Sequence, residues 1–384
     1  MAEVERPGLL VLADDAWDGP KRARHKVPSA MARLGHKTLW IESDVRRRLA
    51  GRPSPSLRAV APDLFVAPVP ILRRSHYGRN PLRRWREPFG VQATRFAIRL
   101  CLRRLNLDPA WVIAWQDPAW ADELRHHRAR GRTTAYFASD LFVDHSGQAR
   151  ERADLARICS AADAVFCTSK QIAGSLPEHD EIHVIPHGID LELWSTPVPD
   201  VPEDLRRIPH PRLLFSGVAT VKFDVKLWRR LATERPDWQL VVVGPVDQAI
   251  ARDWSTLEEL PNVHSLGHRR ASSLPGYLQH ADVLAMPYLR DPVRSHSGLP
   301  NKYYEYLAAG RPILSTPFTE FEDSDPNLVV LEGEGWARVM DDLRGRPHRV
   351  PRLDAHDYLV RAQEVASVLG RRRACQGPSD ATPS

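Results

Sequence analysis

The sequence predicts an α/β protein built from two doubly wound domains, and three observations lead to this expectation. The chain has 384 residues, more than one hydrophobic core usually spans. Short, nearly continuous apolar runs alternate with helix-like segments, which is typical of parallel sheets covered on both faces. A proline-rich stretch without periodicity, residues 195–211, separates the alternation into two halves.

The first half of the chain is expected to form an N-terminal Rossmann-like domain over residues 1–194. Its predicted strands are residues 8–13, 37–42, 64–69, 111–115, 133–137 and 164–168. Helices are expected at 21–34 and 118–130, because each ends at a glycine that suits a left-handed C-cap. In such sheets ligands bind beyond the carboxyl ends of the strands, so residues that follow strands carry most weight.

After the linker at 195–211, the alternation restarts and predicts a second Rossmann-like domain over residues 212–350. The expected strands are 212–217, 238–244, 263–267, 282–287 and 312–317, and the expected helices are 224–234, 273–280 and 300–309. A last helix within residues 351–373 is expected to pack back on the first domain, and residues 374–384 read as a disordered tail. The binding site is expected in the cleft between the two domains.

Composition excludes several classes of protein. The hydrophobic fraction of 42% indicates a globular chain, and no apolar run approaches the roughly 20 residues that span a membrane. The apolar run at 8–13 is too short for a signal peptide, and the four cysteines lack metal-ligand spacing, so a reducing cytoplasm is expected. Ten arginines and one acid lie between Arg73 and Arg104, a cluster suited to anionic lipid or nucleic acid.

The segment SGLPNKYYEYLAAGRPILSTP, residues 297–317, indicates an anion site. It reads as a loop, a helix that starts near Pro300, and a strand. Lys302 then lies in the first helical turn, where a cation opposes the helix dipole unless an anion is bound. Glu305 lies three residues on and shares its face. A nucleotide could use the lysine for its diphosphate and the carboxylate for its ribose; an ordinary surface helix with an ion pair is the alternative.

The same segment, with VIPHGID (184–190) and YLQHADVLAMPY (277–288), resembles the two-domain GT-B glycosyltransferases. The resemblance implies that Glu305 binds donor ribose, and it places Ser297 where many members carry a further glutamate. It also implies a donor role for the loop at Ser297 and Gly298. Gly217 is followed by Val218 instead of the arginine that often grips the diphosphate, which leaves Lys222 as its counterpart. His187 and Gly188 are assigned to the donor side, although both could serve only as a hinge.

A more specific resemblance is to the membrane-associated glucuronosyltransferases of xanthan-type exopolysaccharide synthesis and to teichuronic-acid-type transferases. The segments that carry it are LVLADDAWDGPKRARHKVPSAMARLGH, AYFASD, PHGID, FDVKLW and LPNKYYEYLAAGRP. It implies that the lysine at 302 contacts a nucleotide-sugar donor, with a UDP-sugar favoured, and that Asp140 is the catalytic base. The acceptor would be a lipid-linked or polysaccharide glycan at the inner face of the membrane. The protein would bind that membrane surface through the basic cluster.

Asp140 follows the predicted strand 133–137, so it is also a candidate base by position. Direct displacement with that base would invert the anomeric configuration. Asp144 competes for the role, and Asp140 could instead cap a turn.

The loop after the first strand places Gly19, Arg22 and His25 near an acceptor. Alternatively, Gly19 belongs to an ordinary turn and His25 lies on a solvated helix face. No metal or other cofactor is expected, because helix amides and the lysine could stabilise the leaving diphosphate. The DSD at 323–325 follows the second sheet and is not favoured as a metal site.

Three other functions remain open at this stage. A nucleotide-sugar epimerase of the same architecture would act on a soluble substrate and would not need the basic cluster. A dinucleotide-dependent oxidoreductase is disfavoured because no GxGxxG follows the first strand or the VVVG strand at 238–244. A nucleic-acid-binding protein could use the Arg73–Arg104 cluster, but no aromatic and basic RNA motif accompanies the charge.

Overall fold

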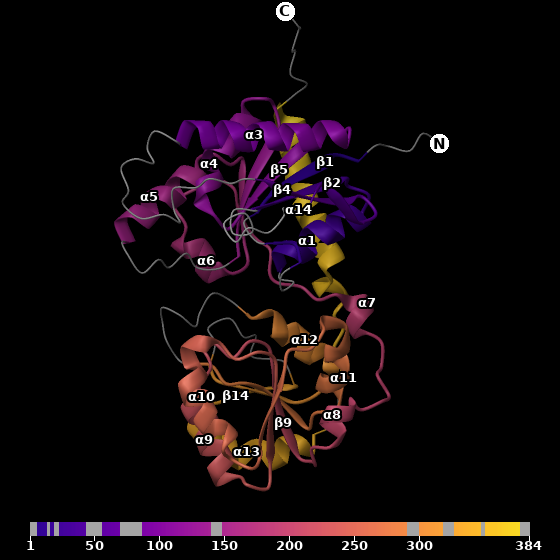
Figure 1. The fold of residues 1–384 in the computed structure, drawn as a ribbon, viewed down its shortest axis with the longest axis vertical. Coiled ribbons are helices and arrows are strands. Elements are labelled where there is room, and N and C mark those ends of the chain that lie inside the picture. The colour runs from indigo at the N-terminus through magenta and orange to yellow at the C-terminus, as the bar shows by residue number, and fades with distance from the viewer. Residues whose placement is uncertain are drawn as a thin grey trace, which may run out of the picture. The chain divides into compact units, whose positions relative to one another are not determined.

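A computed structural model of the chain describes residues 6–13, 16–18, 23–43, 56–69, 87–139, 148–289, 299–317, 326–346 and 350–376. The chain forms two compact units (Figure 1). Unit 1 comprises Met1–Pro186 together with Tyr358–Ser384, and unit 2 comprises His187–Asp357. Each unit holds a mainly parallel sheet with helices on both faces, so the predicted α/β, doubly wound fold class is confirmed.

Unit 1 contains an eight-stranded sheet in the order β3-β4-β2-β1-β5-β6-β7-β8. All neighbouring strands are parallel except the edge pair β3 and β4. The strands are β1 (Gly8–Leu12), β2 (Thr38–Ser43), β3 (Arg58–Ala61), β4 (Leu64–Val69), β5 (Pro109–Trp115), β6 (Thr133–Ala138), β7 (Ala164–Cys167) and β8 (Ile182–Val184). The central strands form because their apolar side chains are buried on both faces, which explains their continuous apolar sequence.

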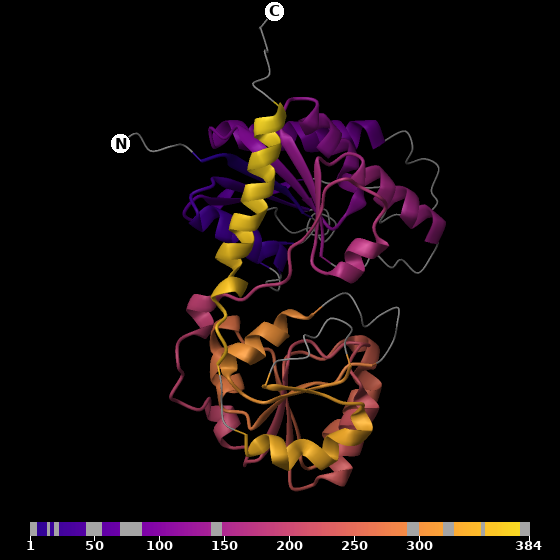
Figure 2. The same ribbon diagram turned by 180° about the vertical axis from the view of Figure 1, so that it is seen from behind.

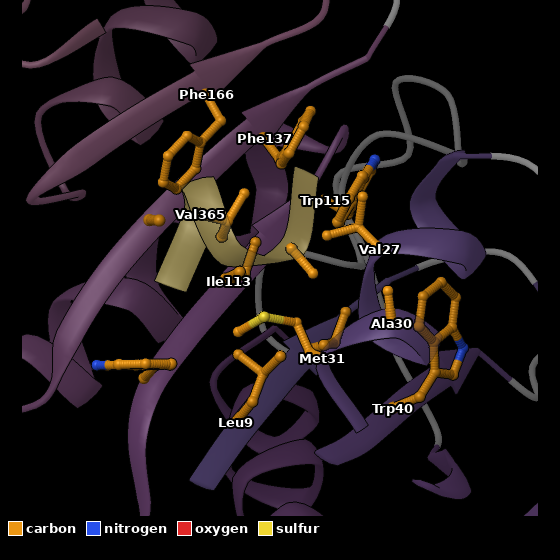
Figure 3. Close-up of a cluster of buried hydrophobic side chains, with 14 of the residues drawn as sticks. Leu9, Val27, Ala30, Met31, Trp40, Ile113, Trp115, Phe137, Phe166 and Val365 are labelled. Carbon is orange, nitrogen blue, oxygen red and sulfur yellow. The ribbon is translucent and has the colours of Figure 1, made fainter. Parts of the chain in front are cut away.

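Helices cover unit 1 in two layers. One face of the sheet packs against α1 (Ala23–Arg33) and α14 (Tyr358–Gln376), and Figure 2 shows α14 lying along it in yellow. Figure 3 shows how Met31 of α1 and Val365 of α14 meet strand residues such as Leu9 and Ile113 in this core. The opposite face packs against α3 (Glu87–Arg104), α4 (Ala121–Arg128), α5 (Gln148–Cys159) and α6 (Lys170–Ser175). No helix in the described ranges is both long enough and apolar enough to cross a bilayer.

Unit 2 contains a six-stranded, fully parallel sheet in the order β11-β10-β9-β12-β13-β14. The strands are β9 (Arg212–Ser216), β10 (Gln239–Val243), β11 (Val263–Gly267), β12 (Val283–Met286), β13 (Ile313–Ser315) and β14 (Leu328–Val330). One face packs against α9 (Val225–Glu234), α10 (Ala251–Glu258) and α13 (Trp336–Arg344). The other packs against α7 (Leu191–Trp194), α8 (Glu203–Arg206), α11 (Leu274–Gln279) and α12 (Asn301–Ala309).

The segment predicted as a linker is built into unit 2. Within residues 195–211 the short helix α8 forms, and Leu205 and Ile208 are buried in the core of that unit. The chain passes from unit 1 to unit 2 between Pro186 and His187, and α14 returns it to unit 1 at Tyr358. Short 3-10 turns precede several helices, at Pro118–Trp120, Gln248–Ile250, Ala271–Ser273, Gly333–Gly335 and Asp354–His356.

Candidate functional site

The sheet of unit 2 has a topological switch point between β9 and β12. From β9 the chain continues to β10 and β11 on one side, and from β12 it continues to β13 and β14 on the other. The two strands are parallel neighbours, with Leu213 opposite Val283 and Leu214 opposite Leu284. Ligands of open α/β sheets bind beyond the carboxyl edge at such a point. The residues that follow these strands are therefore the first candidates for a site.

Two glycines make the backbone unusually close-packed at this edge. Gly217 follows β9 with φ +123°, and Gly244 follows β10 with φ +150°, both in the region that favours glycine. A Cβ atom at Gly244 would lie 2.0 Å from the carbonyl oxygen of Gly217, which no side chain tolerates. A Cβ atom at Gly217 would lie 2.9 Å from Lys302 Nζ. The glycines therefore leave bare backbone beside the lysine ammonium group.

Lys302 lies in the first turn of α12. Pro300 is the N-cap of this helix and supplies no side-chain hydrogen bond to the exposed amides. The Nζ atom of the lysine lies 4.1 Å from the ring centroid of Phe215 and 5.0 Å from that of Tyr288. Burial lowers the pKa of Lys302 from 10.5 to about 7, while the charge of Glu305 acts in the opposite direction. Across the described ranges no carboxylate forms an ion pair with this amino group, so the described part of the site gives it no counter-ion.

Hydrogen bonds to the strand ends fix α12 in this position. The hydroxyl of Tyr306 accepts a hydrogen bond from Ser216 N (2.9 Å) and donates one to the carbonyl oxygen of Ala285 (3.2 Å). One tyrosine thus ties the helix to both strands of the switch point. The backbone of Tyr288 is held in turn by Thr316, whose Oγ1 accepts from Tyr288 N (3.1 Å) and donates to Tyr288 O (2.8 Å). These contacts place the aromatic rings and the helix N-terminus around one point.

Sequence reasoning found part of this arrangement. The structure brings the predicted Gly217, Lys302 and Glu305 together at the carboxyl edge of the sheet, with Glu305 half-buried one helical turn after the lysine. Lys222 is half-buried in the turn after β9, and its carbonyl oxygen accepts from Leu289 N (2.9 Å), which joins that turn to the loop after β12. In the described part of the chain no hydrogen bond joins its side chain to the lysine at 302, so its donor role stays a prediction.

His187 and Gly188 begin unit 2, just before α7. Gly188 is buried, and the adjacent Ile189 donates its N–H to the carbonyl oxygen of His356 (2.8 Å). This pairing gives the segment a structural place at the edge of the unit. The predicted donor contacts of His187 and Gly188 remain predictions.

Several other predicted residues lie outside the described ranges, and the predictions made for them stand as such. They are Asp140 and its competitor Asp144, the loop residues Gly19 and Arg22, the donor-loop residues Ser297 and Gly298, the DSD at 323–325, and the part of the basic cluster that precedes α3.

Sequence reasoning missed Phe215, Tyr288, Tyr306 and Gly244. Gly244 could have been predicted, because it ends the run VVVG as Gly217 ends LLFSG. Two glycines at strand ends in one domain suggest a close approach of two backbone segments. The three aromatic residues carry no such signal. Their role follows from the pairing of β9 with β12, which the sequence alone does not give.

The switch point of unit 1 lies between β1 and β5. Gln116, directly after β5, has φ +62°, a left-handed conformation that is uncommon outside glycine. Its side-chain oxygen accepts hydrogen bonds from Ser139 N (2.9 Å) and Ser139 Oγ (3.1 Å). Its carbonyl oxygen accepts from the hydroxyl of Tyr136 (2.8 Å). These bonds fix the chain at the end of β6, immediately before Asp140 in the sequence.

The predicted acceptor-loop residue His25 is buried in α1, with 1% of its surface exposed. Its ring stacks on Trp40 at a centroid distance of 4.9 Å and meets Trp17 edge-on at 5.4 Å. The loop after β1 is anchored by a hydrogen bond of 2.6 Å from Trp17 N to the buried carboxylate of Glu42. His25 therefore packs the base of this loop, and its contact with an acceptor stays a prediction.

Comparisons with known proteins agree with this arrangement. The family described as Glycosyl transferases group 1 matches residues 211–343, which contain the switch point, both glycines and Lys302. A Bacillus subtilis protein named as the teichuronic acid biosynthesis glycosyltransferase TuaH is 30% identical over 189 residues, covering 46% of each chain. The D-inositol 3-phosphate glycosyltransferase of Xylanimonas cellulosilytica is 27% identical over 244 residues, 56% of this chain and 51% of that protein. The chain thus spans about half the length of the curated relatives it matches.

Solved structures share the fold over nearly the whole chain. The sucrose-phosphate synthase of Thermosynechococcus elongatus superposes with a TM-score of 0.72 at 15% identity, covering 96% of this chain and all of that one. The Anabaena protein HepE, in complex with UDP and glucose, superposes with a TM-score of 0.65 at 12% identity, covering 95% of this chain and 100% of its own. The predicted GT-B fold and the likeness to glycosyltransferases, including one named for teichuronic acid, are confirmed.

Proposed function

We propose that the protein is a glycosyltransferase that moves a sugar from a nucleoside-diphosphate donor, a UDP-sugar in the first place, to a hydroxyl group of a membrane-held glycan. The observation that carries this proposal is Lys302, which lies against aromatic rings without a carboxylate partner in the described ranges, at a helix N-terminus on the switch-point edge of unit 2. The group 1 family match over the same residues and the UDP-bound structural relatives support it.

The donor diphosphate would bind between the lysine and the bare backbone at Gly217. Helix N-termini bind phosphate because their first amides are free to donate and the helix dipole favours negative charge. The nine-residue α12 offers such an end, without a side-chain cap. Any Cβ at Gly217 would approach the ammonium to 2.9 Å, so the glycine keeps space open for phosphate oxygens. Glu305, one turn on, would bind the ribose hydroxyls.

The proposed reaction is a direct displacement at the anomeric carbon. The carboxylate of Asp140 takes the proton of the acceptor hydroxyl as its oxygen bonds to the anomeric carbon. The bond from that carbon to the diphosphate oxygen breaks on the opposite side, which inverts the configuration. The charge that develops on the leaving diphosphate is stabilised by Lys302 and the amides of α12, so the transfer is proposed to need no metal ion.

The acceptor is proposed to lie at an anionic membrane surface, and the outer face of α3 supports this. Phe96 and Leu100 expose 68% and 40% of their surfaces, one turn apart on this helix. Arg99 and Arg103 lie beside them and are exposed, whereas Arg95 is held by Glu123 at 2.8 Å. Apolar side chains flanked by arginine suit the interface of an anionic bilayer. The name of the teichuronic acid relative agrees with cell-envelope synthesis.

The test is an assay with the full chain, radiolabelled UDP-, GDP- and ADP-sugars, and bacterial membranes as the source of acceptor. We expect transfer of label from one UDP-sugar into a lipid-extractable or polymeric product, loss of transfer in Asp140→Asn, and no change on addition of EDTA. The anomeric configuration of the product, read by NMR, tests inversion. An epimerised nucleotide sugar formed without acceptor would indicate an epimerase instead. Absence of nucleotide binding, with tight binding of RNA, would refute the proposal.

A further inference from the structure

The amino group of Lys302 lies against two aromatic rings, and no carboxylate of the described residues pairs with it. Phe215, from β9, and Tyr288, after β12, present their rings to Nζ at 4.1 and 5.0 Å. The two rings meet edge-to-face, with centroids 6.2 Å apart and planes at 78°. Ring faces attract a cation, but they accept no proton and compensate only part of the lost hydration. We call Phe215, Tyr288 and Lys302 the lysine cage.

The groups around the lysine cage determine the pKa of Lys302. Burial lowers the pKa of this lysine to about 7, and Glu305, on the same helix, is the charged group of the described ranges that raises it. Burial raises the pKa of Tyr288 and of Tyr306 above their usual value, so both phenols stay neutral near pH 7. On α11, which packs against α12, the hydroxyl of Tyr277 is engaged with Asp204 (2.8 Å). With a pKa of about 7, Lys302 would be partly ammonium and partly neutral amine in the free protein near neutral pH.

We propose that binding of a nucleoside diphosphate at the lysine cage is coupled to the uptake of a proton by Lys302. Phosphate oxygens bind the ammonium form and not the amine, so binding draws the missing proton from solvent onto Nζ. The nucleotide then supplies the counter-charge that the rings do not. This inference rests on the donor site of the proposed function and adds to it a pH dependence set by the protein, in which donor affinity weakens as the pH rises above neutrality.

The size of the effect follows from the fraction of charged lysine. With half of the molecules charged at pH 7, binding takes up about 0.5 proton, and at pH 8 about 0.9 proton. The apparent Kd is the intrinsic value divided by the charged fraction. Between pH 7.5 and pH 8.5 it should therefore rise about 8-fold. Because the phosphates of UDP are already ionised over this range, a lysine of ordinary pKa would give no proton uptake and a constant affinity.

The experiment is calorimetric titration of UDP into the full chain at pH 8, in two buffers of different ionisation enthalpy such as HEPES and Tris. UDP is fully ionised at this pH, so the dependence of the observed enthalpy on the buffer reports protons taken up by the protein. We expect about 0.9 proton for the wild type. Lys302→Arg should bind UDP with almost no proton uptake, because guanidinium stays charged. The matched control Lys222→Arg, in the neighbouring loop, should keep the uptake of the wild type.

The outcomes separate this inference from the proposed function. Binding of UDP without proton uptake, and with constant affinity from pH 7.5 to pH 8.5, overturns the proton coupling and leaves the donor site intact. No binding at pH 6, where the lysine is charged, overturns the donor site itself. If Lys302→Arg does not bind, Phe215→Leu decides: opening the cage to water should move the pH at which affinity falls upward. An unchanged midpoint in that variant overturns the role of the cage.

Discussion

Replacing Lys302 by methionine should weaken nucleotide binding and at the same time stabilise the free protein. Methionine keeps a flexible unbranched stem of similar length between the rings of Phe215 and Tyr288 and removes the charge. The folded state lowers the pKa of the lysine from 10.5 to about 7. At 1.36 kcal/mol for each pKa unit of this shift, the charged form of the lysine destabilises the fold by at most about 5 kcal/mol. Because methionine does not repack the site of the lysine perfectly, we expect only part of this, about 1–3 kcal/mol, as the net gain on substitution.

The sign of this effect depends on pH. Because the folded-state pKa of Lys302 lies below the unfolded value, the unfolded chain binds more protons between about pH 7 and pH 10.5. The destabilisation is therefore full below pH 7 and disappears as the pH rises towards 10.5. At pH 6.5 we expect Lys302→Met to raise the Tm of unit 2 by about 3–8 °C. The difference from the wild type should shrink steadily from pH 7 to pH 9.5.

The same variant should lose affinity for UDP. Removing a charge-assisted contact to a phosphate costs about 1.5–3 kcal/mol, which corresponds to a Kd about 10- to 150-fold higher. Thermal unfolding by circular dichroism gives the first quantity, and calorimetric titration at pH 6.5 gives the second. Lys222→Met is the matched control, and it should not raise the Tm. A Lys302→Met protein that is no more stable than the wild type, and that binds UDP within threefold of it, would refute the reasoning.

Three further variants test other parts of the structure. Gly244→Ala should destabilise unit 2 by at least about 2–3 kcal/mol in urea unfolding, because its Cβ would lie 2.0 Å from the carbonyl oxygen of Gly217. If Gly244→Ala is as stable as the wild type, the close approach of the Gly244 and Gly217 backbones is contradicted. Tyr306→Phe should cost about 1–3 kcal/mol by leaving the N–H of Ser216 without its acceptor. Phe96→Glu should reduce co-sedimentation with anionic vesicles several-fold and leave the Tm unchanged, because the side chain is 68% exposed; unchanged sedimentation would exclude this face of α3.

The fold could be predicted because its strands are buried on both faces. In β9, Leu213 and Phe215 face one core and Leu214 faces the other, so the whole strand is apolar and stands out in the sequence. The role of Lys302 could be predicted in part, since a proline followed by a cation at a helix start indicates a bound anion. Its pKa could not, because it depends on rings that β9 and β12 bring together only in the folded sheet.

The first domain shows where sequence reasoning reaches its limit. His25 was expected near an acceptor or on a solvated helix face; its ring is buried against Trp40, which corrects the solvated alternative and leaves the acceptor contact a prediction. A histidine in a helix start gives the same sequence signal whether its ring is buried or exposed. Gln116 was not singled out, because its left-handed backbone has no marker in the sequence. Its two hydrogen bonds to Ser139 appear only when β5 and β6 pair.

Within the described ranges, the two switch points present different groups, and this difference argues for which unit binds which substrate. At the edge of unit 1, neutral amide and hydroxyl groups of Gln116, Ser139 and Tyr136 bond to one another. At the edge of unit 2, a cation is buried against aromatic rings at the expense of stability. Proteins keep locally unfavourable groups mainly where function needs them. A nucleoside diphosphate compensates such a cation, whereas a sugar hydroxyl does not. We therefore propose that the donor binds to unit 2, on energetic grounds that do not depend on the family resemblance.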